Sequence, residues 1–284
     1  MSKEKLDVYQ IVNDRIIDLL EQGVVPWHKP WSGGRDAAPA NLVSKKPYRG
    51  LNVWLLGSMG YSSPYWVSYK QATELGGQVR KGEKSTLVVY WKMLETIDKD
   101  TKEKKVIPML RYYNVFNVTQ CDNLKYPEVE GVKVNDFNPI DEAEKIVANM
   151  QKAPVITHNE QRAYYRRDTD LVNMPVKGSF DKPEEYYNTL FHELTHATGH
   201  ESRLGRFQDK VSRFGDSNYA KEELVAEMGA SYLCAVAGIV ERTIDNSAAY
   251  ISNWLTKLKN DKKLVVSAAG KAHAATDFIL GVSA

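Results

Sequence analysis

The segment Phe191-His192-Glu193-Leu194-Thr195-His196 combines residue types that bind metal with one that moves protons. On a helix, His192 and His196 lie one turn apart on the same face, so both imidazoles can bind one metal ion. Glu193 lies about 100° around the helix from His192, beside the open position of such a metal. There it can take a proton from a metal-bound water, as the general base of a zinc peptidase does. The spacing predicts a Zn²⁺ site, with another divalent metal such as Mn²⁺ as the alternative.

Two histidines on a helix can also be incidental, so a third ligand decides between a metal site and coincidence. Metzincins have a third histidine at the position that Ser202 occupies here, and the chain departs from that class. Residues 219–230 predict a buried helix whose small residues, Gly229 among them, permit a close crossing. Glu223 and Glu227 share one face of this helix. Buried carboxylates need a partner, and a metal with its histidines would supply one.

We predict that Glu223 is the third ligand and that Glu227 orients a ligand histidine. This spacing of acids resembles the second helix of glutamate-type zincins, in which the first acid binds the metal. The reverse assignment, with Glu227 on the metal, stays open at the level of sequence. Glu222 is expected to face solvent.

Basic and aromatic residues are concentrated between residues 27 and 92. This window holds ten Lys and Arg residues against three acids, and five of the six tryptophans of the chain. Single-stranded nucleic acids are bound by cations that follow the phosphates and by rings that stack on unpaired bases. Most Trp and Tyr side chains pack in cores, so packing is the competing interpretation of each ring. The candidate DNA contacts are Trp27, Lys29, Trp31, Lys45, Lys46, Tyr48, Arg49, Lys70, Arg80, Lys81 and Lys84.

The chain of 284 residues is long enough for two domains. Residues 122–138 carry proline, glycine and scattered charge and predict a linker. We therefore predict an α+β protein with a single-stranded-DNA-binding domain over residues 1–130. A zincin-like metallopeptidase domain is predicted over residues 138–284.

Within these domains, hydrophobic periodicity predicts a first helix over residues 8–20. Ser68 and Gln71 predict a capping box, and residues 86–92 and 106–118 predict a hairpin. Residues 163–175 are predicted to form one strand directly before the helix with the two histidines. In zincins, the strand at this position is the edge strand that pairs with an extended peptide.

Some classes of protein are disfavoured. There is no long apolar run and no apolar N-terminal signal, so we expect a cytoplasmic protein without a membrane partner. Cys121 and Cys234 are far apart and predict neither a disulfide framework nor a cysteine metal site.

Several segments carry a resemblance to a known family: residues 26–31, 48–52, 69–72, 75–77, 80–84, 191–200, 203–204 and 219–227. Through them, and over nearly its whole length, the chain resembles the plasmid- and phage-borne antirestriction proteins of the ArdC type. This resemblance implies an N-terminal single-stranded DNA-binding domain and a C-terminal domain similar to SprT-like zinc metallopeptidases. It also implies a role in protecting DNA that enters a new host from restriction, with a protein substrate or a restriction-system component as further partner.

A different class of function also fits the sequence. The chain could be a DNA-binding shield whose metal site is structural or vestigial and whose proteolysis is not required. A structural zinc normally has four protein ligands, whereas the sequence indicates three, which favours the catalytic interpretation.

Overall fold

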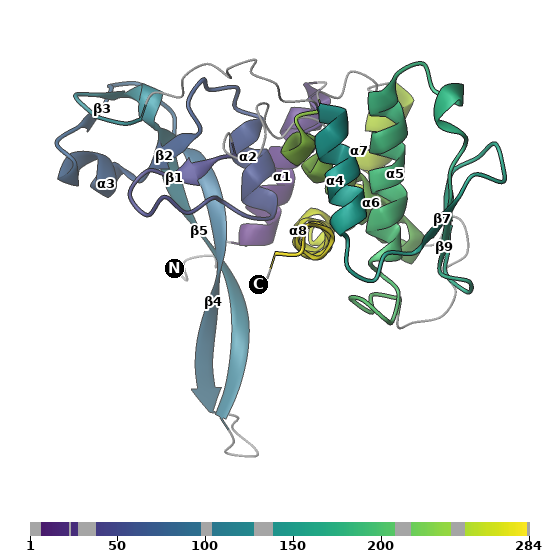
Figure 1. Ribbon diagram of the computed structural model, residues 1–284. Coiled ribbons are helices and arrows are strands. Elements are labelled where there is room, and N and C mark those ends of the chain that lie inside the picture. The colour runs from purple at the N-terminus through teal and green to yellow at the C-terminus, as the bar shows by residue number, and fades with distance from the viewer. Residues whose placement is uncertain are drawn as a thin grey trace.

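The computed structural model describes residues 7–22, 24–27, 38–97, 104–127, 139–207, 217–239 and 248–282. Figure 1 shows strands and short helices on one side, a central group of helices, and a second small sheet on the other side. Among the described helices, none is both long and apolar enough to cross a membrane.

The first half of the chain is built on a four-stranded sheet with the order β1-β2-β5-β4. The predicted capping box at the start of α3 is confirmed: Gln71 N donates to Ser68 Oγ, and the Gln71 side chain accepts from Ser68 N. The elements are α1 (Val8–Glu21), β1 (Ala40–Asn41), α2 (Leu51–Gly57), β2 (Tyr65–Val67), α3 (Tyr69–Glu74), β3 (Gln78–Val79), β4 (Thr86–Ile97), β5 (Lys104–Asn117) and β6 (Cys121–Asp122).

The predicted hairpin is confirmed, and it is longer than the sequence pattern suggested. β4 has 12 residues and β5 has 14, and they pair in register from Thr86↔Val115 to Ile97↔Lys104. Val88 and Val115 near its base are fully buried. Beyond this base the two strands project away from the rest of the molecule (Figure 1).

In the second half, the described residues form the three-stranded sheet β7-β9-β8 and five α-helices. The segment 163–175, predicted as one strand, forms two short strands that turn at Asp170 with a positive φ of 47°. The strand directly before α5 is therefore the central strand β9, and β8 lies at the edge instead. The elements are α4 (Pro139–Asn149), β7 (Val155–Thr157), β8 (Tyr164–Arg166), β9 (Leu171–Asn173), α5 (Pro183–Ala197), α6 (Ser217–Ala237), α7 (Ala248–Asn260) and α8 (Leu264–Leu280).

One hydrophobic core joins the two halves. It contains buried residues of α1 and α2, of α6, and of α7 and α8. In the same region, the side chain of Asn13 on α1 donates to the carbonyl of Leu258 on α7 at 3.0 Å. The helix that carries Glu223 is thus packed directly against the N-terminal half of the protein.

Candidate metal centre

The sequence of α5 explains where the helix begins and which of its faces is buried. Pro183 occupies the first turn, where its missing N–H costs nothing, and Glu184 and Glu185 complement the positive end of the helix dipole. Phe191 and Leu194 are fully buried, which fixes the rotation of the helix. The face with His192 and His196 then lies toward α6.

The helix α6 crosses α5 closely, as its small residues predicted. A Cβ built on Gly229 would lie 2.5 Å from Thr195 Cγ2 on α5, closer than two such atoms can approach. Leu224 and Met228 are fully buried on α6. This packing brings the acids of α6 to the histidines of α5.

Three side chains on these two helices converge. His192 Nε2 and His196 Nε2 lie 3.1 Å apart, and the Glu223 carboxylate lies 3.6 Å from the first and 3.5 Å from the second. One donor atom from each residue falls within 4.8 Å of the others, an arrangement that can hold a metal ion. Two imidazole nitrogens facing each other and a carboxylate form a donor set suited to a divalent metal. The sequence-predicted ligands are therefore together in space.

The base predicted beside the ligands is buried. Glu193 is 8% exposed, and burial raises the pKa of its carboxyl, although His192 and His196 oppose this shift. The backbone N–H of Tyr165 on β8 also bonds to this carboxylate. A carboxyl with a raised pKa beside a donor cluster has the properties of a general base.

The charges of the cluster are mutually dependent. Burial disfavours the charged form of His192, but its contact with the Glu223 carboxylate and the charge of Glu193 outweigh this, so its pKa is raised. Glu227 is half-buried one turn beyond Glu223, and its charge contributes in the same direction. The assignment of Glu227 as an orienting residue stays a prediction.

The expectation for Glu222 was wrong. Its side chain is only 18% exposed, and its carboxylate lies 3.6 Å from Nδ1 of His196. It also accepts from Arg206, at 2.6 Å, and the Arg206 side chain is 7% exposed. Burial alone would raise the pKa of Glu222, but the contact with His196 and the hydrogen bonds from Arg206 outweigh it and lower the pKa. Sequence spacing could not reveal this role, because Arg206 belongs to a separate segment.

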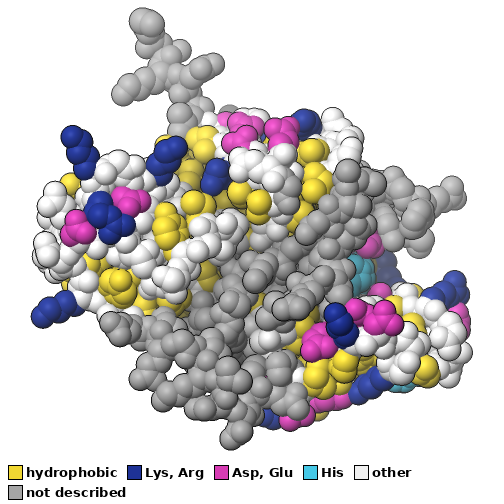
Figure 2. Space-filling view, turned by 90° about the horizontal axis from the view of Figure 1, so that it is seen from above, with side chains coloured by type: hydrophobic (Ala, Val, Ile, Leu, Met, Phe, Trp, Pro, Cys, Tyr) yellow, Lys and Arg dark blue, Asp and Glu magenta, His cyan; other side chains and the backbone are white. Residues whose placement is uncertain are grey.

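The predicted DNA contacts fall into two groups. Lys45, Lys46, Lys70, Lys81 and Lys84 are exposed. They belong to the end of the molecule that carries β1, α3 and β3 in Figure 1, and Figure 2 shows basic side chains there with a few acidic ones. The exposed ring of Tyr69, 60% accessible, lies beside Lys70 on α3 and was not among the predicted contacts.

The other described candidates have structural partners. Trp27 is fully buried against Trp254, and Tyr48 is 8% exposed, so neither ring is available to stack on a base and both predictions are corrected. Arg49 donates to His273 Nε2 at 2.7 Å and pairs with Asp277 on α8. Arg80 is exposed but pairs with Glu83 at 2.7 Å. Lys29 and Trp31 lie outside the described residues.

The chain aligns end to end with solved structures. It is 42% identical to the metal-free crystal structure of antirestriction protein ArdC from plasmid R388, covering 96% of this chain and 97% of that one, with a TM-score of 0.76. The Mn(II)-bound structure of that protein matches at 42% identity and a TM-score of 0.75. The chain belongs to the ArdC antirestriction family. Its predicted α+β fold with a zincin-like C-terminal part is thereby confirmed.

Two family models match the chain, one in each half. The N-terminal domain of anti-restriction factor ArdC matches residues 6–116, and a zincin-like metallopeptidase matches residues 141–271. The uncharacterized protein y4eC of Sinorhizobium fredii (strain NBRC 101917 / NGR234) is 34% identical over 96% of this chain and 91% of its own length. Two Escherichia coli proteins named DNA primase TraC are 36% and 37% identical over 99% and 97% of this chain. The chain spans only 28% and 20% of their respective lengths.

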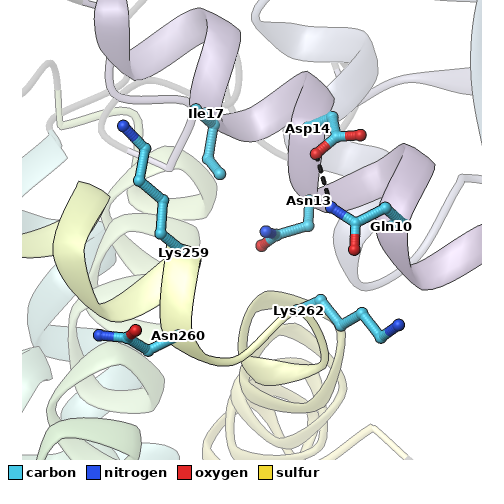
Figure 3. A pocket seen from close by; sticks show the side chains of 7 residues that line it. All are labelled: Gln10, Asn13, Asp14, Ile17, Lys259, Asn260 and Lys262. Carbon is cyan, nitrogen blue, oxygen red and sulfur yellow. Dashed lines mark hydrogen bonds between the residues drawn. The ribbon is translucent and has the colours of Figure 1, made fainter.

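A polar pocket lies away from the candidate metal centre, between α1 and the end of α7. Gln10 donates to Asp14 at 2.8 Å on one wall, while Lys259 and Lys262 lie on the other (Figure 3). Both lysines form ion pairs, with Glu21 and Asp7 respectively. The pocket shares no residue with the cluster on α5 and α6.

Proposed function

We propose that the chain binds single-stranded DNA through its N-terminal half and carries a divalent-metal peptidase site in its C-terminal half. In this proposal, the two together protect incoming DNA from restriction in the cytoplasm. The observation that carries the peptidase part is the convergence of His192, His196 and Glu223, with the buried Glu193 beside them. The partners would be single-stranded DNA and a protein substrate or restriction-system component.

The donor set fits the metal that a zincin-like fold requires. His192, His196 and Glu223 would hold Zn²⁺ or Mn²⁺, since imidazole and carboxylate ligands suit both ions. When bound, such a metal lowers the pKa of water and polarises a carbonyl group. Three protein ligands leave a position open, as in catalytic rather than structural zinc sites.

The other steps belong to side chains and backbone of this chain. Glu193 would remove a proton from the attacking water, because its buried carboxylate lies beside the donor cluster and burial raises its pKa, which makes it a stronger base. The edge strand β8 lies next to Glu193 through the N–H of Tyr165. An extended peptide paired with this edge would place its carbonyl groups near the donor cluster.

The DNA part is supported by charge and exposure. The exposed lysines at the α3 and β3 end provide cations for phosphates, and Tyr69 provides an accessible ring next to Lys70. Because such contacts are electrostatic, affinity for single strands should fall steeply as salt rises. We expect single strands to bind better than duplex.

The test compares wild type with Glu193→Gln and His196→Ala in four assays: metal content, hydrolysis of an unfolded protein substrate, binding of an oligonucleotide, and protection of transferred DNA from restriction. We expect about one metal per chain in wild type and Glu193→Gln, and loss of most metal in His196→Ala. Hydrolysis should disappear in both variants. Glu201→Gln, at an exposed position after α5, is the matched control.

Protection decides the biological role. Loss of protection in both variants, with oligonucleotide binding retained, would support a peptidase that acts in antirestriction. Full protection by Glu193→Gln, together with no hydrolysis by wild type, would contradict the peptidase and support a DNA-binding shield.

A further inference from the structure

The projecting part of the β4–β5 hairpin exposes more apolar and aromatic surface than its packing requires. Of the fifteen large hydrophobic side chains that are exposed among the described residues, seven lie on this hairpin. They are Tyr90, Trp91, Met93, Val106, Ile107, Tyr112 and Tyr113. Such a concentration on one protruding element marks an interaction surface.

The strand register divides this surface into two different faces. Paired residues of antiparallel strands point to the same side, and alternate residues point to opposite sides. Tyr90 pairs with Arg111, Lys92 with Met109, and Thr96 with Lys105. One face, here called the basic face, therefore presents Tyr90, Lys92, Lys105, Arg111 and Tyr113.

The basic face carries charge of one sign only. Between Val88 and Thr96 and between Lys105 and Tyr113, all of which the structure describes, it has three cations and no acidic side chain. The opposite face has Glu95 among its exposed side chains, beside apolar residues such as Met93 and Val106. The partner of the basic face must therefore be anionic, and a second copy of the same face would place like charges together.

Two tyrosine rings lie among these cations. Tyr90 and Tyr113 are 45% and 40% exposed, and their ring centroids are 5.8 Å apart with an interplanar angle of 62°. Arg111 lies directly across from Tyr90. Accessible rings beside cations match the chemistry of an unpaired nucleic acid strand, whose bases stack and whose phosphates are negative.

The base of the hairpin is held firmly, which makes the face a defined surface. The side chain of Asn52 on α2 accepts from Val89 N and donates to Val89 O, both at 2.8 Å. Leu110 enters the core that joins the two halves of the chain.

We propose that the basic face binds single-stranded nucleic acid, with Tyr90 and Tyr113 stacking on bases and Lys92, Lys105 and Arg111 contacting phosphates. This rests on the proposed function and extends it, because these residues lie on a separate element from the lysines of α3 and β3. A strand that contacts both regions would run along the sheet to the projecting hairpin.

The chain offers a matched test in two pairs of identical neighbours on β5. Tyr113→Ala with Lys105→Ala alters the basic face, whereas Tyr112→Ala with Lys104→Ala removes the same groups from the opposite face. The exposed fraction of Tyr112, 36%, is similar to that of Tyr113, 40%. Binding of both full-length double variants to a labelled oligothymidine and to a duplex would be measured by fluorescence anisotropy at several salt concentrations. Thermal unfolding would verify that both are folded.

We expect the basic-face variant to bind the oligothymidine about tenfold or more weakly, with a shallower salt dependence, and the other variant to stay within about twofold of wild type. A bromouridine-substituted strand should crosslink to the peptide that contains Tyr113. Three results would overturn the inference, provided that wild type binds single strands. They are equal effects of the two double variants, no effect of either, and a loss of binding that is confined to duplex. Absence of any oligonucleotide binding by wild type would instead overturn the proposed function as well.

Discussion

The carboxylate of Glu222 lies 3.6 Å from Nδ1 of His196, on the side of the imidazole opposite to the nitrogen that faces Glu223. Arg206 fixes this carboxylate and also donates to the carbonyl of Thr195 at 2.8 Å. Nδ1 of the His196 imidazole therefore contacts the Glu222 carboxylate, which in turn accepts a hydrogen bond from the buried Arg206 guanidinium. If His196 binds metal as proposed, this neighbour sets the orientation and the tautomer of its imidazole.

Glu222→Gln should weaken metal binding by about 10–100-fold, because Gln cannot hold Nδ1 of His196 as an anion does. The measurement is a competition titration with a chelator, which reads metal affinity independently of hydrolysis. Glu201→Gln should leave the affinity unchanged. An affinity for Glu222→Gln equal to that of wild type would show that the carboxylate has no orienting role.

Gly229→Ala should destabilise the protein by about 1–3 kcal/mol, because the added methyl group would overlap Thr195 and force α5 and α6 apart. Metal affinity should fall with it, since the proposed ligands come from these two helices. Gly270→Ala is the contrasting change: this position on α8 has open space around a Cβ, and Ala should stabilise the helix by about 0.5–1 kcal/mol. Urea unfolding of the three proteins measures both effects; a neutral Gly229→Ala would contradict the close crossing.

Trp27→Ala should lower the free energy of unfolding by about 3–5 kcal/mol, because the ring is fully buried against Trp254. Under conditions where the variant stays folded, its affinity for single strands should match that of wild type. Tyr69→Ala, which removes an exposed ring, should show the opposite pattern, with little change in stability and weaker binding. A binding defect in folded Trp27→Ala would restore its interpretation as a stacking residue.

The pair of Asp170 and Arg203 should give the protein a defined sensitivity to acid. Burial alone would raise the pKa of Asp170, but hydrogen bonds from Arg203 and Tyr165 outweigh it and hold the pKa below 3.8. A lowered carboxyl pKa stabilises the fold above the ordinary value of 3.8, and this contribution is lost as pH falls through the folded-state value.

Asp170→Asn should therefore cost about 2 kcal/mol at neutral pH, since it removes a charged acceptor from an almost fully buried guanidinium. The difference from wild type should shrink as pH falls below 3.8, the ordinary pKa of an aspartate, which is measured by urea unfolding at several pH values. The exposed pair of Glu142 and Lys145 is the control, because Glu142→Gln should change stability by no more than about 1 kcal/mol. A difference for Asp170→Asn that does not depend on pH would exclude this linkage.

Sequence reasoning succeeded where the placement of side chains depends on spacing within one element. The juxtaposition of His192 and His196 follows from helical geometry, and the close crossing follows from small residues such as Gly229. Their roles, and that of Glu193, stay predictions. It failed where a side chain meets a distant segment. Nothing near Trp27 in the sequence reveals Trp254, and nothing near Arg49 reveals Asp277. Exposure of a ring or cation depends on tertiary packing, so composition can indicate a DNA-binding region without identifying its contacts.

The hydrogen bond from Asn13 to Leu258 joins residues 245 positions apart, and the core around it unites α1 with α7 and α8. During synthesis α1 leaves the ribosome long before these helices exist, so the part of its surface that packs on α7 and α8 stays uncovered until almost the whole described chain has been made. Contacts of such long range slow folding and expose the nascent segment to aggregation and to chaperones. A chain interrupted before α7 would lack the last two helices of this core and leave part of its apolar surface exposed, which would make incomplete products targets for degradation.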